Sequence, residues 1–330
     1  MNKKVVVLGG GTGLSVILRG LKLFPIDITA IVTVSDDGGS TGELRKNFNI
    51  PALGDLRKVL VALSETEPLV EDLLQYRFKK VAGLKGHPTG NLLLAALLDI
   101  TGNLADAVEA LSKVLNIKGT ILPLTEDKSI LVAETKDGKI IEGESSITKA
   151  GCEINTIKYK EKPEVTKEAI TAIEEADLVV MGIGSLYTSV IPNLLCPEIC
   201  DAIKASAAKK LFISNIMTQH GETDKFKVSD FIKIAEQYVG DSFIDAIIVN
   251  NGRIDNHIKK RYAKTEKSTP VIFDKKNVEK YNAKIIEEDL VDIVEEKDWY
   301  NPKRTDKMIR HNSMKLSLLI FTYLISKKDN

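Results

Sequence analysis

The first fifteen residues join a short apolar run to a glycine-rich loop and then to a helical pattern. The loop reads GGGTG over residues 9–13. Glycine has no Cβ, so backbone N–H groups can approach an anion closely, and the unpaired N–H groups at a helix start point to the same place. A tight turn without a ligand is the alternative. We expect a phosphate or diphosphate to bind at Gly10, Gly11, Thr12 and Gly13.

The residues that follow the glycines limit which anion fits the loop. A P-loop places Lys and then Ser or Thr after its last glycine, whereas Leu14 and Ser15 follow here. The dinucleotide fingerprint requires a further glycine, which would fall at position 14 or 16. The chain has Leu14 and Val16 there. The loop therefore predicts anion binding without indicating ATP, and NAD(P)-dependent reduction is disfavoured.

Two adjacent carboxylates, Asp36 and Asp37, lie in a second glycine-containing loop with the sequence SDDGG. Carboxylates beside a phosphate site commonly bind Mg²⁺ or act as a general base, and one of them could instead bind ribose hydroxyls. Asp-Gly is also a common turn sequence, so a purely structural role is the alternative. Asp55 either adds to this pair or simply begins a helix at Leu56.

A third loop, GIGSLYTS at residues 182–189, offers hydroxyls and backbone amides to a second phosphate or a sugar. Its candidate ligand contacts are Gly184, Ser185 and Tyr187. The alternative is that a serine of this loop acts as a catalytic nucleophile, but the loop lacks the GxSxG pattern and no histidine is linked to it. We therefore interpret the loop as a binding element.

Two further motifs contain polar residues beside helical patterns. Asn91 follows GHPTG at the start of an apolar helix, where it could hydrogen-bond a base or a sugar. For His87 in the same motif, three roles stay open: a general acid, a contact to a ligand, or a histidine that simply packs within the loop. Arg310 opens the final helical pattern, where a cation opposes the helix dipole unless an anion lies nearby. An anionic ligand or a solvated surface position would each explain it.

These loops must be positioned by strands that alternate with helices, which predicts a parallel sheet with helices on both faces. Apolar runs predict strands at residues 4–8, 28–34, 178–181, 211–213 and 246–249, and helical periodicity predicts helices at 13–23, 55–63, 69–78, 91–100 and 105–115. A polar loop follows each strand, so five loops should meet at the carboxyl edge of the sheet. We predict a Rossmann-like, doubly wound, mostly parallel α/β fold.

Residues 117–159 show a different pattern, with β-branched runs and the turn sequence KDGK at residues 136–139. This combination is typical of a β-hairpin. We interpret the segment as a small antiparallel β insertion. The Rossmann-like domain is then formed by residues 1–116 and 160–330.

Composition excludes several classes of partner. The chain has 330 residues, of which 43% are hydrophobic, and 46 basic residues balance 46 acidic ones. This balance argues against a nucleic-acid strand or an anionic membrane surface as a partner. The apolar stretches are too short for a signal peptide or a membrane span. The three cysteines, an odd number, fit a reducing cytoplasm.

Taken in chain order, the motifs resemble the bacterial gluconeogenesis factor family, which is related to the 2-phospho-L-lactate transferases of deazaflavin cofactor synthesis. The resemblance rests on GGGTGLSVILRGLK, ITAIVTVSDDGGSTGELR, GDLRKVLVAL, GHPTGNLLLAAL, GIGSLYTSVIPNLL, NIMTQHGETDKFKVSDFI and IRHNS. It implies a Rossmann-like core, UDP-N-acetylglucosamine as the ligand, and a role in cell shape and wall synthesis on gluconeogenic carbon sources.

Residue by residue, the resemblance matches Thr12 and Arg310 to nucleotide-sugar contacts, and Asp36, Asp37, Asn91 and residues 184–187 to shared pocket motifs. It favours a cytoplasmic regulator that binds a nucleotide-sugar and requires no cofactor. We expect a regulatory protein partner and a homo-oligomer. The alternative is a Mg²⁺-dependent transferase of the 2-phospho-L-lactate type, acting on a nucleotide-activated donor with the metal on Asp36 and Asp37.

Overall fold

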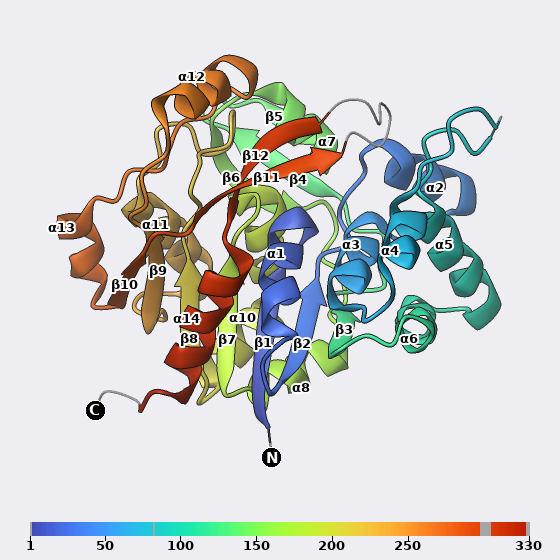
Figure 1. Cartoon of the computed structure of the whole chain (residues 1–330), viewed down its shortest axis with the longest axis horizontal. Helices are drawn as coiled ribbons and strands as arrows, with labels where there is room; N and C mark the ends of the chain where they lie inside the picture. Colours follow the sequence, from blue (N-terminus) through green and yellow to red (C-terminus); the bar gives the residue numbers. More distant parts are fainter. Residues whose placement is uncertain (1, 82, 298–304, 328–330) are drawn as a thin grey trace.

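A computed structural model of the chain describes residues 2–81, 83–297 and 305–327, and a parallel sheet forms its centre (Figure 1). Seven strands pair in the order β10-β9-β8-β7-β1-β2-β3, and every neighbouring pair is parallel. The strands are β1 (Lys3–Gly9), β2 (Ile26–Val32), β3 (Thr120–Pro123), β7 (Leu178–Gly182), β8 (Lys209–Ile213), β9 (Ala246–Asn250) and β10 (Lys284–Glu288). The predicted doubly wound α/β fold is confirmed.

The strand order places a switch point at the centre of the sheet. From β1 the chain builds outward through β2 and β3 on one side, and it later adds β7, β8, β9 and β10 on the other. The central strands are buried on both faces, as in a parallel sheet covered by helices on both sides. Between β1 and β7 the connections leave in opposite directions, so a crevice opens outside the carboxyl ends of these two strands.

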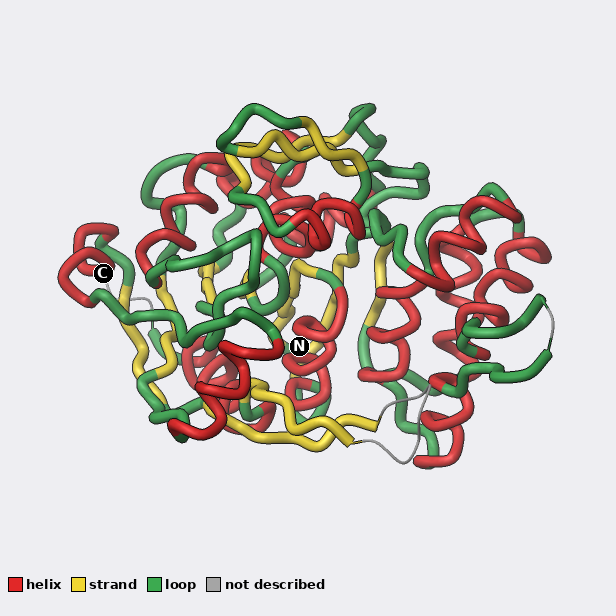
Figure 2. Tube along the Cα trace, turned by 90° about the horizontal axis from the view of Figure 1, so that it is seen from above, coloured by secondary structure: helices red, strands yellow, loops and turns green. Residues whose placement is uncertain are grey.

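Two layers of helices cover the sheet, as Figure 2 shows from above. One layer consists of α1 (Gly11–Leu21), α3 (Gly54–Leu63) and α14 (Ser313–Ile325), and in it α1 packs against both of the other helices. The other layer consists of α8 (Lys167–Glu174), α9 (Ile191–Leu194), α10 (Pro197–Ala205) and α11 (Val228–Val239). Each layer has its own apolar core, separated from the other core by the sheet.

Additional helices extend the molecule beyond the β3 edge, on the right of Figure 1. They are α2 (Gly39–Phe48), α4 (Pro68–Gln75), α5 (Thr89–Thr101) and α6 (Leu104–Val114). The five helices predicted from periodicity are confirmed, and each begins and ends within three residues of the expected position. The remaining helical segments outside the insertion, apart from the π-helical turn described with the site, are α12 (Asn256–Thr265), α13 (Lys275–Val278) and η2 (Glu279–Tyr281).

The insertion forms a three-stranded antiparallel sheet in the order β5-β4-β6. Its elements are β4 (Leu131–Thr135), β5 (Ile140–Glu142), α7 (Glu144–Ala150) and β6 (Ile154–Tyr159). The expected start at residue 117 is too early, because Thr120–Pro123 pairs in parallel with β2 as the edge strand of the main sheet. The antiparallel sheet therefore begins at residue 131.

Near the C-terminus, β11 (Val291–Lys297) and β12 (Thr305–His311) form an antiparallel ribbon. Arg310 belongs to this ribbon, so its expected place at the start of the last helix is wrong. The pairing with β11 keeps the backbone extended through residue 311, and α14 begins at Ser313 after its cap, Asn312, whose side chain accepts a hydrogen bond from the backbone of Lys315. Across the described part of the chain, every helix is too short or too polar to cross a membrane.

Candidate functional site

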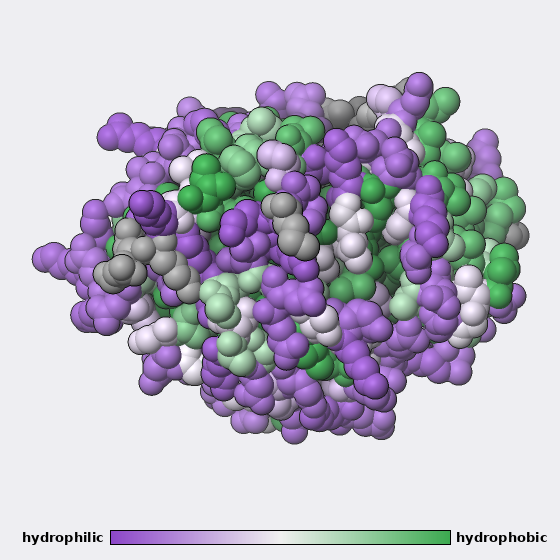
Figure 3. Space-filling model, turned by 90° about the horizontal axis from the view of Figure 1, so that it is seen from below, coloured by the Kyte–Doolittle hydropathy of each residue, from purple (hydrophilic) through white to green (hydrophobic). Residues whose placement is uncertain are grey.

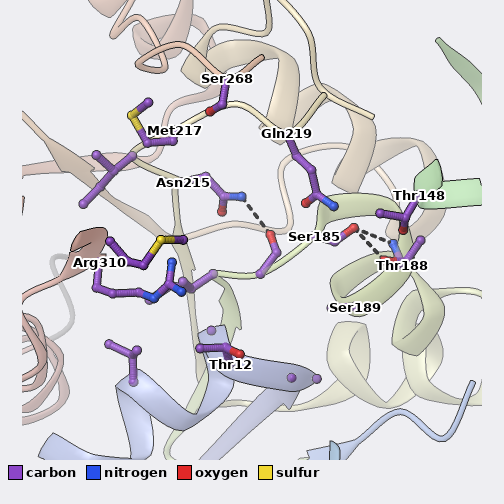
Figure 4. Close-up of a pocket in the computed structure, with 18 of the residues that line it drawn as sticks. Thr12, Thr148, Ser185, Thr188, Ser189, Asn215, Met217, Gln219, Ser268 and Arg310 are labelled. Carbon is purple, nitrogen blue, oxygen red and sulfur yellow. Dashed lines mark hydrogen bonds between the residues drawn. The ribbon is translucent and has the colours of Figure 1, made fainter. Parts of the chain in front are cut away.

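A cavity of about 500 Å³ lies at the carboxyl ends of β1, β2, β7 and β8 (Figure 4). Its walls come from the loops after these strands, the first turns of α1 and α3, the insertion helix α7, and parts of α12 and β12. Four of the five expected loops therefore line one cavity. The loop after β9, residues 250–252, does not, because β9 lies farther from the switch point between β1 and β7.

The glycine loop forms the floor of the cavity and leads directly into α1. Gly11 has a φ of +63°, a left-handed conformation that favours glycine. A Cβ on Gly10 would lie 2.7 Å from both Asp55 Oδ2 and Thr33 Oγ1, so a side chain there would require both of these side chains to move. The cap residue of α1 is Gly10, which has no side chain, and this leaves the N–H groups of the first turn available to an anion.

The loop after β7 packs closely against the glycine loop. Gly13 contacts the backbone of this loop, and a Cβ on Gly13 would lie 2.7 Å from the nitrogen of Gly184. Ile183 adopts a φ of +54°, which is rare for a β-branched residue and is found mainly where the surrounding structure enforces it. The backbone of this loop is therefore held in one arrangement, and Asn215 Nδ2 adds a 2.7 Å hydrogen bond to the carbonyl of Gly184.

Glu222 is a buried carboxylate that joins three segments of the wall. Its Oε1 accepts hydrogen bonds from Gln219 Nε2 at 2.6 Å and from Thr148 Oγ1 at 3.4 Å. Its Oε2 accepts a short hydrogen bond from Ser185 Oγ, which in turn accepts one from the backbone of Thr188 at 3.0 Å. Burial raises the pKa of Glu222 to about 7. Ser185 thus donates to a carboxylate and has no histidine partner, which matches a binding element better than a nucleophile.

One end of the cavity gathers three carboxylates and one ammonium group. Lys58 Nζ donates to Asp55 Oδ1 at 2.9 Å, and Asp55 raises the pKa of Lys58. Burial, and then the carboxylate of Asp55, raises the pKa of Asp36. Burial, together with Asp36 and Asp55, raises the pKa of Glu144 to about 7. This end is therefore acidic, and it favours cations, protons or hydroxyl donors over a second anion.

Arg310 reaches the cavity from β12, and Figure 4 shows it facing Thr12 of the glycine loop and Asn215 of the loop after β8. The neighbouring His311 is buried, and its Nε2 lies 3.1 Å from the carbonyl of Ser214. Burial lowers the pKa of His311 to about 4, so the ring is neutral at physiological pH and donates this hydrogen bond. His311 thereby fixes β12 to the loop after β8 and positions Arg310.

The structure brings most of the predicted site residues together. Those that line the cavity are Gly10, Gly11, Thr12, Gly13, Asp36, Gly184, Ser185 and Arg310. Asp37, Asn91 and Tyr187 do not line it. Whether any of these residues binds a ligand stays a prediction.

Each of the three exceptions has a structural role. Asp37 Oδ1 accepts a 2.8 Å hydrogen bond from the backbone of Ser145 and so anchors α7. Tyr187 is buried in the second apolar core, because the π-helical turn Leu186–Val190 that begins after Ser185 directs it inward.

Asn91 belongs to a buried network beside the cavity. Its Oδ1 accepts a 2.9 Å hydrogen bond from Arg57 Nε, and its Nδ2 lies 3.3 Å from Ser40 Oγ. His87 Nδ1 lies 2.8 Å from the same Ser40 oxygen, so His87 is a packed loop histidine.

The separation of Asp36 from Asp37 also changes the expected metal site. Asp36 faces the same end of the cavity as Asp55, whereas Asp37 is used by α7. Among the described residues, no group of three or more His, Cys, Asp or Glu side chains is arranged to hold a metal ion. If Mg²⁺ binds with a ligand, Asp36 and Asp55 are the carboxylates that could hold it, and their hard oxygens suit that ion.

Our sequence-based set of site residues lacks Lys58, Glu144 and Glu222. Lys58 and Asp55 are three apart in the first turns of α3, so the spacing of GDLRK is the signal that could have identified Lys58. Glu144 lies in the insertion, and nothing in its local sequence indicates that α7 folds against the cavity. Glu222 lies in a polar loop whose burial depends on tertiary packing.

We expect substitution of Glu222 by Gln to change how stability depends on pH. The pKa of Glu222 in the folded protein, about 7, lies above its usual value of 4.5. The folded chain thus binds more protons than the unfolded chain in this window, and the free energy of unfolding falls as pH rises through it. In Glu222→Gln this fall should shrink by about 2–3 kcal/mol. Urea denaturation at pH 5 and pH 8 measures the difference.

The exposed Glu134 of β4 supplies the control, because Glu134→Gln should retain the wild-type difference between the two pH values. If Glu222→Gln and the wild type show the same difference in free energy of unfolding between pH 5 and pH 8, then Glu222 ionises in the folded protein at little cost, which would contradict its buried position.

The fold and its cavity define a doubly wound α/β protein with a ligand-sized cavity at the switch point of its sheet. A family profile described as 2-phospho-L-lactate transferase CofD matches residues 5–291. The chain belongs to the gluconeogenesis factor family, as its motifs predicted.

Two relatives and one solved structure match over almost their full lengths. The gluconeogenesis factor of Halalkalibacterium halodurans is 49% identical over 96% of this chain and 94% of that protein. The gluconeogenesis factor of Bacillus subtilis is 45% identical over 97% of this chain and 98% of that protein. An X-ray structure of a Bacillus halodurans protein superposes with a TM-score of 0.90 at 48% identity, covering 97% of this chain and all of that one.

Proposed function

We propose that the cavity binds a nucleotide-sugar, with UDP-N-acetylglucosamine as the candidate, and that the protein is a cytoplasmic regulator rather than an enzyme. The observation that carries this proposal is the pairing of the glycine loop with Arg310 across one cavity. The N–H groups of α1 and a guanidinium from β12 would hold a diphosphate between them, as helix starts and arginines commonly do.

The remaining walls suit the two ends of such a ligand. Asn215, Thr218, Gln219 and Ser268 offer amides and hydroxyls, and Met217 offers apolar contact. A volume of about 500 Å³ falls in the range of ordinary small-molecule sites. The acidic end with Asp36 and Glu144 would accept hydrogen bonds from ribose or sugar hydroxyls.

A regulatory role is supported by the names of the relatives, which are called gluconeogenesis factors. Arg310 lies on the β11–β12 ribbon, so ligand contact with Arg310 links the cavity to a ribbon that a partner protein could recognise. We propose that this link connects nucleotide-sugar level on gluconeogenic carbon sources to cell-wall synthesis and cell shape.

Isothermal calorimetry with UDP-N-acetylglucosamine tests the ligand. Thr12 is exposed in the first turn of α1 and faces the cavity, so its hydroxyl can donate to a diphosphate. We expect binding by the wild type and about 10- to 100-fold weaker binding by Thr12→Ala, the usual cost of one hydrogen bond to a charged group. Thr156→Ala, at an exposed position of β6, should bind like the wild type. Equal binding by Thr12→Ala, or no binding by the wild type, would contradict the proposal.

The transferase alternative is favoured by the match of the CofD profile to residues 5–291. In that case Mg²⁺ on Asp36 and Asp55 would support transfer from a nucleotide-activated donor to an acceptor. Turnover of such a donor with Mg²⁺ across a panel of acceptors, lost in Asp36→Asn, would establish this activity. The absence of turnover across the panel would favour the regulator.

A further inference from the structure

The face formed by α4 and α5 exposes an unusual amount of apolar surface. Only three of the thirteen residues of α5 are buried, although its sequence is TGNLLLAALLDIT. Leu93, Ala96 and Ile100 are exposed on α5 at the spacing of one helix face, and Leu69 and Leu73 are exposed one turn apart on α4. Leu69 and Ile100 are each 78% exposed. Figure 3 shows apolar side chains gathered at the end of the molecule that contains these helices.

The size of this α4–α5 face approaches that of a protein interface. The exposed parts of its large side chains amount to on the order of 500 Å², near the upper limit for the largest apolar patch on a monomer. A stable complex buries about 800 Å² per partner. The half-exposed residues of α5 and a polar rim would supply the remainder.

Charges at the two ends of α5 differ in sign. The segment that leads into α5 exposes three lysines, Lys79, Lys80 and Lys85, and it is held beside the helix start by the pairing of Arg77 with Pro88. The last turn of α5 exposes Asp99. The helix dipole has the same polarity, positive at the start and negative at the end. Two copies of α5 placed antiparallel would therefore bring opposite charges together at both ends.

We propose that the α4–α5 face binds a second copy of this chain and forms a two-fold symmetric dimer in which the two α5 helices pack antiparallel. A two-fold axis makes the interface self-complementary, so each end of the helix pair contains lysines from one subunit and Asp99 from the other. Leu93, Ala96 and Ile100 form the central stripe, and Leu69 and Leu73 of α4 flank it. The cavity at the switch point stays open, since α4 and α5 do not line it.

Sedimentation velocity on the full chain tests the dimer. We expect the wild type to dimerise at micromolar concentration, and Ile100→Lys to weaken the dimer at least tenfold, because it places two lysines in the apolar stripe. Leu69→Lys provides a second variant at an equally exposed position. The control is Ile140→Lys on β5, which is 65% exposed and lies outside the face. Circular dichroism of each variant verifies that it is folded.

Asp99→Asn tests the orientation of the helices. In the antiparallel dimer it removes two attractive contacts and should weaken association about two- to tenfold, whereas in a parallel dimer it would remove a repulsion and strengthen association. A wild type that remains monomeric, a dimer that Ile100→Lys and Leu69→Lys leave unchanged, or equal weakening by Ile140→Lys would each overturn the proposal. So would strengthening by Asp99→Asn.

Discussion

Replacement of Gly13 by alanine is expected to remove nucleotide-sugar binding and to lower the free energy of unfolding by about 1–3 kcal/mol, the usual cost of forcing extra atoms into a packed site. The added Cβ would lie 2.6 Å from the carbonyl carbon of Ile183 and 2.7 Å from the nitrogen of Gly184. Both atoms belong to backbone, which cannot move aside as a flexible side chain can. The loop after β7 would be displaced, and with it the contact between Gly184 and Asn215.

Gly9 in the same loop is the matched control. Its Cβ would meet only the side chain of Leu14, at 3.6 Å or more, which is ordinary van der Waals contact. Gly9→Ala should therefore retain wild-type affinity in calorimetry and wild-type stability in urea denaturation. Equal effects of the two substitutions would show that the loop tolerates no side chain at all, and would remove the specific role assigned to the contact between Gly13 and the loop after β7.

The sheet and the helices could be predicted from the sequence because their signals are local. The apolar runs that predict β1, β2, β7, β8 and β9 and the helical periodicity of α1, α3, α4, α5 and α6 depend on residues that are near one another in the chain. The edge strand Thr120–Pro123 gives only a weak local pattern, because it has four residues and ends in proline. Its membership of the main sheet depends on pairing with β2, which no local pattern specifies.

The candidate site was predictable mainly where a loop follows a recognised strand, and Arg310 on β12 is the exception. Gly10 to Gly13, Asp36 and Ser185 all satisfy that condition and line the cavity. Asp37 follows the same strand as Asp36, but it does not line the cavity, because its side chain accepts a hydrogen bond from the backbone of α7. Glu144 lines the cavity, and Glu222 bonds to residues of its wall, through tertiary contacts between segments that are far apart in the chain. The sequence around each of them contains no sign of that contact.

Replacement of Arg310 by alanine is expected to weaken binding of UDP-N-acetylglucosamine about 10- to 100-fold, since a charge-assisted hydrogen bond to phosphate typically contributes about 1.5–3 kcal/mol. Among the described residues, Arg310 is the only arginine that lines the cavity. Lysine keeps the charge but not the forked geometry, so Arg310→Lys should bind with intermediate affinity. Stability should change little, because the strand register and the buried His311 hold β12 independently of the Arg310 side chain.

The control for this substitution lies on the same strand. Lys307 is exposed three residues before Arg310, an odd spacing that places it on the other face of β12, and it does not line the cavity. Lys307→Ala removes the same unit of charge and should leave affinity within about twofold of the wild type, because exposed charges are screened by salt. Calorimetry that finds equal losses for Lys307→Ala and Arg310→Ala would attribute the effect to net charge. Unchanged binding by Arg310→Ala would place the diphosphate away from β12 and leave the glycine loop as its sole anchor.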